Sequence, residues 1–145
     1  MLGETKRVET HRLRELLIKH EGLSLKPYRC TAGKLTIGVG RNLDAIGITR
    51  GEAMLLLSND IDRVLKEATV HFPWFNSLCP ARQDVVVSMI FNLGLDGFKK
   101  FKNTINAIQS GDFEKAASEM LSSKWADQVG DRDLELAKMM RQGTY

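Results

Sequence analysis

The chain has 145 residues, a length typical of one domain. Apolar residues make up 43% and charged residues 27%, a balance that fits a globular protein and excludes a disordered chain, a collagen or a disulfide scaffold. The longest apolar stretch falls well short of the roughly 18 residues that a membrane-spanning helix needs. The net charge of +3 is mild and favours an acidic partner such as a cell-wall polymer, a membrane surface or nucleic acid, without selecting among them.

The cysteines and the N-terminal residues limit the cofactors and the compartment. Cys30 and Cys79 are far apart, and with three scattered histidines they match no zinc-ligand spacing, so we expect no metal and no other cofactor. Free thiols favour a reducing compartment. Residues 1–7 are charged and lack the apolar stretch of a signal peptide. We therefore expect the protein to stay in the cytoplasm in which it is made until another factor releases it.

The first third of the chain predicts one helix followed by a small hairpin. Apolar periodicity predicts a helix over residues 9–21, with one face made of Leu13, Leu16, Leu17 and His20. Proline and several glycines then break any helix between residues 24 and 48. Short strands are predicted at residues 27–30 and 34–39, joined by a turn at residues 31–33, with a possible third strand near residues 46–48.

The rest of the chain predicts helices. Thr49 and Glu52 form a capping box, so a long helix should follow to about Thr69. Pro80 suits the first turn of the next helix, which should run to about Leu93 and is apolar enough to be central and buried. Shorter helices are predicted at about residues 103–110, 112–123 and 131–142.

These elements predict a mostly helical α+β fold in a single domain over residues 1–145. A small β-hairpin lobe would occupy about residues 24–48. A helical lobe would combine residues 9–21 and 70–145, and residues 50–69 would form the connecting helix. Two lobes joined by one long helix predict a cleft in which a polymer substrate could lie.

One group of side chains in this arrangement suggests acid–base chemistry. Glu21 ends the first predicted helix, where the negative end of the helix dipole disfavours an ionised carboxylate. A carboxyl group that holds its proton is what a general acid requires. Cys30 and Thr36 lie on the adjacent strands, and Gly38 and Gly40 allow close approach of the backbone to a ligand.

Each of these residues also fits a purely structural role. Glu21 could be an exposed helix-end carboxylate, Cys30 a small buried apolar residue, and Thr36 an ordinary strand residue. Taken singly, the structural interpretation is the commoner one.

The same residues carry a resemblance to a known family. The segment HEGLSLKPYRC at residues 20–30, followed by GKLTIGVG at residues 33–40, resembles the active-site segment of the phage-type lysozymes (endolysins, glycoside hydrolase family 24). That family's pattern is Glu, eight residues, Asp or Cys, five residues, then Thr, and Glu21, Cys30 and Thr36 match it. The resemblance extends over all but about the first ten residues.

The resemblance implies a role for each matching residue. Glu21 would be the general acid, Cys30 the second catalytic group, and Thr36 the residue that positions water or sugar. Arg132 would pair with the catalytic glutamate, and a cation there would favour the ionised carboxylate, against the helix-end effect. The positions that would contact the sugar are Phe91, Thr104 and Asn42, and Glu119 also aligns with a cleft position.

Cysteine at position 30 changes the available charge, because many family members carry aspartate there. A free thiol has a pKa of about 8.5 and is mostly protonated at neutral pH. An ionised Cys30 could attack the sugar directly, which gives retention, or activate water, which gives inversion. Carboxyl-type groups roughly 5 Å apart favour direct attack, and a separation of roughly 6.5–9.5 Å leaves room for water.

The resemblance implies an endolysin that hydrolyses the β-1,4 bond between N-acetylmuramic acid and N-acetylglucosamine in bacterial peptidoglycan and so lyses the host. The enzyme would be a monomer, would not insert stably into a membrane or bind nucleic acid, and would reach the wall or periplasm with the help of a holin. One alternative is a lytic transglycosylase, in which the muramic acid 6-hydroxyl attacks and anhydro ends form. A second is a non-catalytic module that binds peptidoglycan.

Overall fold

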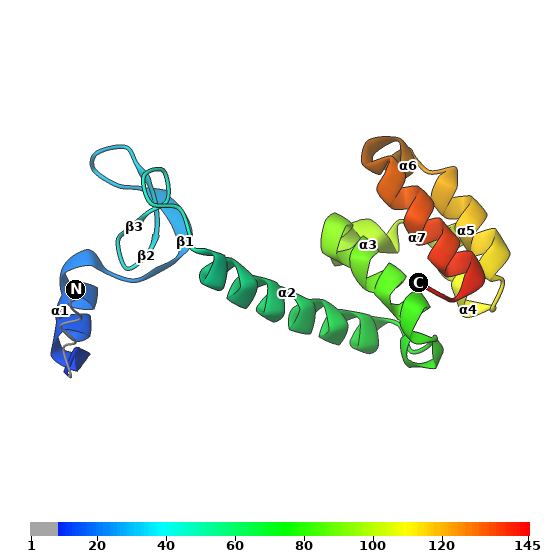
Figure 1. Cartoon of the computed structure of the whole chain (residues 1–145), viewed down its shortest axis with the longest axis horizontal. Helices are drawn as coiled ribbons and strands as arrows, with labels where there is room; N and C mark the ends of the chain where they lie inside the picture. The colour runs from blue at the N-terminus through cyan, green and yellow to red at the C-terminus, as the bar shows by residue number, and fades with distance from the viewer. Residues whose placement is uncertain (1–8) are drawn as a thin grey trace, which may run out of the picture. The chain divides into compact units, whose positions relative to one another are not determined.

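The computed structural model describes residues 9–145, apart from the side chains of Gln128 and Val129. The prediction made from residues 1–7 therefore lies outside the described residues. The chain divides into a first compact unit that ends at Met54 and a second unit, Leu55–Tyr145. The helices and the small sheet labelled in Figure 1 confirm the mostly helical α+β class. Within residues 9–145, no helix combines the length and the apolar character that crossing a membrane requires.

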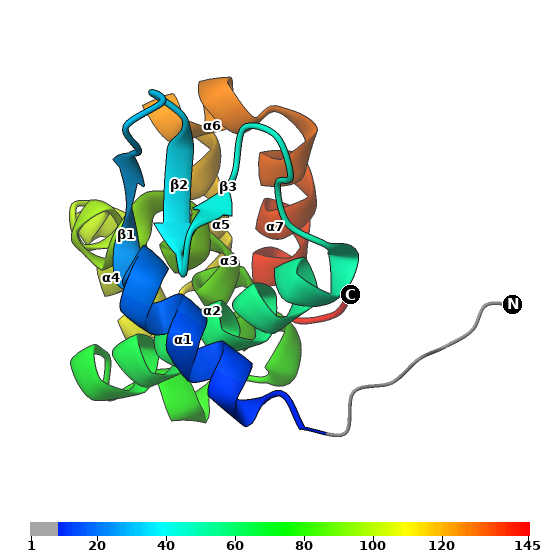
Figure 2. The same cartoon turned by 90° about the vertical axis from the view of Figure 1, so that its left-hand side faces the viewer.

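The first unit contains one helix and a three-stranded antiparallel sheet of order β1-β2-β3 (Figure 2). Its elements are α1 (His11–Glu21), β1 (Ser24–Arg29), β2 (Leu35–Gly38) and β3 (Arg41–Asn42). The helix ends at Glu21 because Gly22 adopts a φ of 79°, which residues with a side chain rarely do, while its N–H donates to the Ile18 carbonyl oxygen at 2.8 Å. The predicted order of helix and hairpin is confirmed.

The strand register places the end of α1 and Cys30 at opposite ends of the β1–β2 ladder. Its Cα partners are Ser24 with Gly38, Tyr28 with Thr36, and Arg29 with Leu35. At the far end, the Cys30 N–H donates to the Lys34 carbonyl oxygen at 3.0 Å, which closes the turn predicted at residues 31–33. Glu21, three residues before β1, is thereby brought to the end of the sheet where β2 turns into β3.

The prediction of a third strand near residues 46–48 is wrong, because the third strand is β3, Arg41–Asn42. The Ile46 N–H donates to the Asn42 carbonyl oxygen at 2.9 Å, and the Gly47 N–H donates to the Leu43 carbonyl oxygen at 3.1 Å. These local bonds satisfy the backbone in a turn and leave Ile46 68% exposed. The apolar character of this segment had suggested a strand, but β-propensity is a weak guide without a partner strand.

The long helix α2 (Arg50–His71) begins at the predicted capping box. The Glu52 N–H donates to Thr49 Oγ1 at 3.1 Å, and the Thr49 N–H donates to Glu52 Oε1 at 2.8 Å. Near its C-terminal end, Val64 and Ala68 are buried in the core of the second unit.

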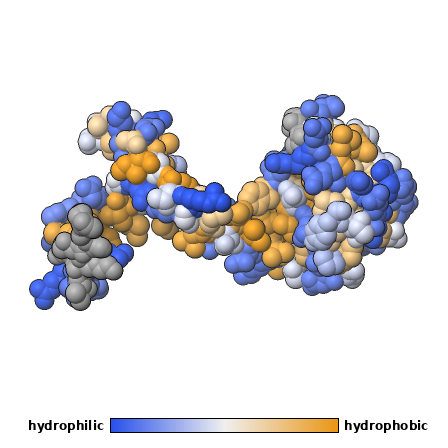
Figure 3. Space-filling view, viewed as in Figure 1, coloured by the Kyte–Doolittle hydropathy of each residue, from blue (hydrophilic) through white to orange (hydrophobic). Residues whose placement is uncertain are grey.

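Several other apolar side chains of α2 remain exposed, and Figure 3 shows apolar surface along this helix. Leu55 is 62% exposed and Leu56 is 52% exposed. Leu57, Ile61 and Leu65 are somewhat less exposed and line one wall of a pocket in the second unit.

The second unit packs short helices around one apolar core. Its elements after α2 are η1 (Phe75–Ser77), α3 (Pro80–Lys99), α4 (Lys102–Gln109), α5 (Phe113–Leu121), α6 (Lys124–Val129) and α7 (Asp131–Gln142). Val85, Val86, Met89 and Ile90 of α3 are fully or almost fully buried, which confirms that this helix is central.

Two helices of the second unit differ from the prediction. Helix α3 extends beyond Leu93 to Lys99, with a kink where Gly94 adopts a φ of 78°, so the glycine bends the helix rather than ending it. Helix α6 has no counterpart among the predicted helices. It has six residues, too few for a clear apolar period, and begins where the Ser123 hydroxyl accepts the Ala126 N–H at 3.3 Å.

A buried carboxylate lies in the first turn of α7. Asp133 is 1% exposed, and neither of its carboxylate oxygens has a hydrogen-bond partner among the described residues. Desolvation raises the pKa of Asp133 from 3.8 to about 6, because burial penalises the charged form. The folded state therefore prefers the protonated acid, and ionisation of Asp133 at neutral pH opposes folding.

We expect Asp133→Asn to raise the free energy of unfolding at about pH 7.5 by roughly 1–3 kcal/mol, because it removes the cost of a buried charge. The gain should shrink as the pH falls from about 6 to 4 and vanish near pH 3.5, where Asp133 is protonated in both the folded and the unfolded state. Urea denaturation at the two pH values measures this difference. The control is Asp131→Asn, which removes an exposed carboxylate from the same helical turn. Equal stabilities of the Asp133→Asn variant and the wild type at neutral pH would contradict the account.

Candidate functional site

The carboxylate of Glu21 lies against the backbone of Gly40. A Cβ atom added to Gly40 would lie 2.9 Å from Glu21 Oε2 and 3.2 Å from both Glu21 Cδ and Cγ. The Cα of Gly40 therefore forms a cradle that only a residue without a side chain can offer. Glycine at this position had suggested close approach of a ligand, and the group that approaches is Glu21 itself.

The cradle belongs to the turn that joins β2 to β3. Gly38 has a φ of 69° and Gly40 a φ of 65°, values that favour glycine. The paired residues Ile37 and Arg41 flank the turn on either side. The turn thus places the Gly40 backbone next to the side chain of Glu21, the last residue of α1.

Cys30 and Thr36 come together near the other end of β2. Thr36 is 4% exposed, and its hydroxyl donates to the Lys34 carbonyl oxygen at 2.8 Å. The same hydroxyl also reaches the Cys30 sulfur. A hydroxyl has one proton, so Thr36 donates either to the carbonyl oxygen or to the sulfur at any moment. The structure thus brings together two of the three residues that match the family's catalytic pattern.

The surroundings of Cys30 favour its thiolate form. Backbone N–H groups of Lys34 and Ala32 are the main causes that lower the pKa of the Cys30 thiol, and the Thr36 hydroxyl adds to them, while partial burial opposes them. Hydrogen bonds to a charged acceptor stabilise the charged form. A thiolate at this position could accept a proton from water or act as a nucleophile.

The separation between the two ends of the site follows from the register. The ladder from Gly38 to Leu35 comprises three residue steps, which at about 3.3 Å per residue amount to roughly 10 Å of strand. Glu21 belongs to one end of this ladder and Cys30 to the other. The register therefore places the two groups at opposite ends of β2.

Asn42, predicted to contact the sugar, lies on β3 opposite Thr36 and is half-buried. Its side-chain oxygen accepts the Ala45 N–H at 3.0 Å. This oxygen is therefore engaged in holding the turn that follows β3, and a contact of Asn42 with substrate stays a prediction.

The second unit contains four further predicted residues, distributed over two pockets. Phe91, which is 47% exposed, and Arg132 line a pocket of about 440 Å³ together with Leu57, Ile61 and Leu65. The pocket combines apolar side chains with the Arg132 guanidinium and with the polar residues Asp84, Ser88 and Asn92. Because Arg132 belongs to the second unit, its predicted pairing with the catalytic glutamate stays a prediction.

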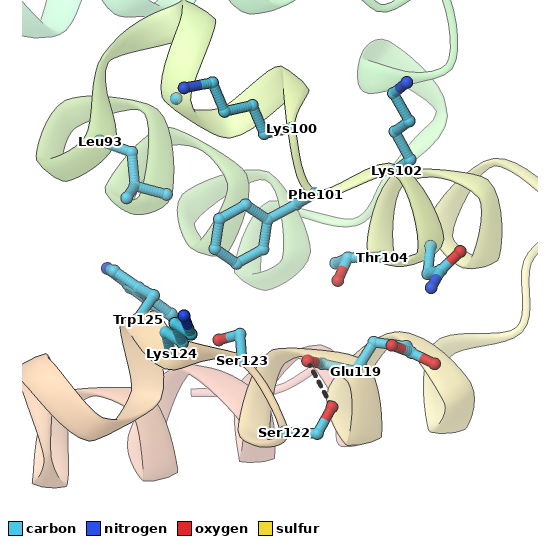
Figure 4. Close-up of a pocket in the computed structure, with 12 residues that line it drawn as sticks. Leu93, Lys100, Phe101, Lys102, Thr104, Glu119, Ser122, Ser123, Lys124 and Trp125 are labelled. Atoms are coloured by element: carbon cyan, nitrogen blue, oxygen red, sulfur yellow. Dashed lines mark hydrogen bonds between the residues drawn. The ribbon is translucent and has the colours of Figure 1, made fainter.

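Thr104 and Glu119 line the other pocket, of about 700 Å³ (Figure 4). The figure shows the Phe101 ring on the side of the pocket that holds Trp125, and Thr104 of α4 facing the helix that carries Glu119. Trp125 is buried, stacks edge-on against Phe101 with ring centroids 6.2 Å apart, and donates from Nε1 to Asn92 Oδ1 at 2.7 Å.

The larger pocket has a basic character, to which a run of lysines in the sequence, residues 99–102, contributes. The cations that line it are Lys100, Lys102 and Lys124. Lys124 begins the unpredicted helix α6, so its proximity to the other two lysines had no signal in the apolar pattern.

Comparisons with known proteins identify the family of this chain. The phage lysozyme family profile matches residues 18–142. An endolysin of Acyrthosiphon pisum secondary endosymbiont phage 1 is 33% identical over 117 residues, which cover 77% of this chain and 75% of the relative. A SAR-endolysin of Escherichia phage Mu is 30% identical, and the match covers 86% of this chain and 76% of the relative. A probable T4-type lysozyme 2 of Dictyostelium discoideum is 24% identical, and the match covers 91% of this chain and 95% of the relative. The chain belongs to the phage lysozyme family, whose members are lysozyme-type hydrolases.

We expect Gly40→Ala to lower lysozyme activity about tenfold or more, because the new methyl group would displace the Glu21 carboxylate from its position. The matched control is Gly38→Ala. It imposes a similar backbone strain, with a φ of 69°, but its added methyl group meets no atom within 4 Å. Clearing of a bacterial cell-wall suspension measures the activity of both variants. Equal losses in the two variants would show that backbone strain, and not contact with Glu21, explains the effect.

Proposed function

We propose that this protein is an endolysin that hydrolyses the β-1,4 bond between N-acetylmuramic acid and N-acetylglucosamine in bacterial peptidoglycan and thereby lyses the host cell. Membership of the phage lysozyme family supports a wall-degrading enzyme. One observation carries the assignment of residues: the Glu21 side chain packs against Gly40 at one end of β2. The Cys30–Thr36 pair lies near the other end of the same strand.

Glu21 acts as the general acid. Cleavage of a glycosidic bond passes through an oxocarbenium-like transition state, and the departing oxygen needs a proton. A carboxyl group supplies that proton when it is held in one orientation. The Glu21 side chain fills the space that a Cβ at position 40 would occupy, and this close fit supports such an orientation.

Cys30 acts as the base that removes a proton from the attacking water. The backbone N–H groups of Lys34 and Ala32 stabilise the thiolate that this role requires. Placement of the two groups at opposite ends of β2 is the reason for proposing water between acid and base rather than direct attack by sulfur. Thr36, within reach of the sulfur, orients the water or the sugar. The reaction would then invert the anomeric configuration.

The substrate contacts proposed for the second unit follow from the family resemblance. Phe91 offers an exposed ring, Arg132 offers a cation in the same pocket, and Thr104 lines the larger pocket. Peptidoglycan carries both apolar sugar faces and carboxylates, which suit an aromatic ring and a guanidinium group. Access of the enzyme to the wall would depend on a holin.

A lytic transglycosylase is the main alternative. Such an enzyme needs one acid and no base for water, because the muramic acid 6-hydroxyl attacks. The hydrogen bonds that stabilise a Cys30 thiolate would then have no catalytic purpose. They therefore favour hydrolysis.

Replacement of Glu21 by Gln should reduce the clearing of purified peptidoglycan at least about 100-fold, because the amide cannot donate a proton to the leaving oxygen. The control is Glu15→Gln, which removes an exposed carboxylate from the same helix. Turbidity of the peptidoglycan suspension measures the rate. Clearing by Glu21→Gln at the wild-type rate would show that another group is the acid.

Two substitutions at Cys30 separate a catalytic from a structural thiol. We expect Cys30→Asp to keep substantial activity, since a carboxylate can also accept a proton, and Cys30→Ser to lose at least about tenfold, since a hydroxyl remains neutral. Cys79→Ser serves as the control for loss of a thiol elsewhere. The same clearing assay compares the three variants. Full activity of Cys30→Ser would remove this residue from the mechanism.

A further inference from the structure

The turn that seats Glu21 depends on two glycines for its backbone conformation. It carries glycine at positions 38 and 40, and glycine leaves the backbone more freedom than any other residue. A loose turn would let the Glu21 carboxylate shift, and a displacement of about 1 Å in a catalytic group can cost a hundredfold in rate. Some other interaction must therefore hold this turn in place.

The residue after Gly40 makes that interaction. Arg41 donates from Nη1 to Glu52 Oε1 at 2.9 Å and from Nη2 to Glu52 Oε2 at 2.8 Å. Nη1 also donates to the Gly47 carbonyl oxygen at 3.0 Å. A two-pronged bond of this kind fixes direction as well as distance.

Glu52 is itself held in place, so it can serve as an anchor. Its Oε1 accepts the Thr49 N–H at 2.8 Å, and its own N–H donates to Thr49 Oγ1 at 3.1 Å. Hydrogen bonds from Arg41 and from the Thr49 backbone lower the pKa of Glu52 to about 2. Glu52 therefore stays ionised and paired at any pH at which a lysozyme would work.

We propose that the Arg41–Glu52 pair positions the general acid: it fastens β3 to the first turn of α2 and so holds the Gly40 backbone against the Glu21 carboxylate. Arg41 and Glu52 are positioning residues that act through Gly40, and neither needs to touch substrate. The inference rests on the proposed function of Glu21. It assigns a catalytic consequence to a capping box that the sequence had suggested only as the start of a helix.

A stabilising ion pair and a positioning pair differ in what their loss changes. A pair that only stabilises the fold would lower the folded fraction and leave the turnover of folded molecules unchanged. A positioning pair would lower kcat of the folded enzyme while KM stays nearly constant, because the interaction lost is one made in the transition state. Partly exposed ion pairs contribute little to stability in general, so the two effects are separable.

The experiment compares Arg41→Met, Glu52→Gln and the double variant with the wild type on soluble glycan strands. We expect kcat to fall about tenfold in each single variant, with KM changed less than about twofold, and to fall no further in the double variant. Arg41→Lys, which keeps the charge but loses the two-pronged bond, should have an intermediate kcat. Circular dichroism gives the folded fraction at the assay temperature, by which each kcat is normalised.

The control variant is Glu114→Gln. It breaks another exposed ion pair, in which Arg141 Nε donates to both Glu114 carboxylate oxygens at 3.0 Å, and this pair belongs to the second unit. Its kcat should equal that of the wild type.

A normalised kcat of Arg41→Met and Glu52→Gln equal to the wild type would overturn the inference, as would a loss of the same size in Glu114→Gln. Failure of the proposed function has a different signature, because Glu21→Gln would then cleave the strands as fast as the wild type. Loss of activity in Glu21→Gln together with unchanged Arg41 and Glu52 variants would leave Glu21 as the acid and reject the positioning role alone.

Discussion

The site depends on the contact between the Glu21 carboxylate and the bare Cα of Gly40. A carboxyl side chain at the end of a helix ordinarily samples several rotamers in water, and ordering it costs entropy. Here the β2–β3 turn supplies a surface against which the side chain rests. The order of the chain makes this possible, because Gly22 ends α1 and Ser24 pairs with Gly38, so that helix end and turn meet.

Strand β2 connects this contact to the other predicted site residues of the first unit. Strand β2 links the acid at one end to the Cys30–Thr36 pair at the other, and the turn after Cys30 directs N–H groups at the sulfur. A thiolate that receives backbone hydrogen bonds needs no neighbouring cation to form. Backbone geometry in the sheet thus positions the Glu21 carboxyl at one end and lowers the pKa of the Cys30 thiol at the other.

The sequence predicted the parts of this site whose signals are local. The end of α1 at Glu21, the turn at residues 31–33 and the capping box at Thr49 each depend on a few neighbouring residues, and all three are confirmed. The contact of Glu21 with Gly40 joins residues far apart in the chain and had no such signal. The third strand was misplaced for the same reason, since strand pairing is decided by a partner and not by the segment alone. Helix α6 was too short for its period to be visible.

The measurement that tests the central role of Glu21 most directly compares leaving groups. Wild type and Glu21→Gln are assayed on muramyl glycosides that differ in one respect: one carries N-acetylglucosamine as the leaving sugar, the other dinitrophenol, which departs without a proton. Acid catalysis by Glu21 predicts a loss of at least about 100-fold on the sugar and a loss of less than about tenfold on the aryl glycoside. Equal losses on both substrates would contradict it, because a residue that serves only to bind or to fold affects the two bonds alike.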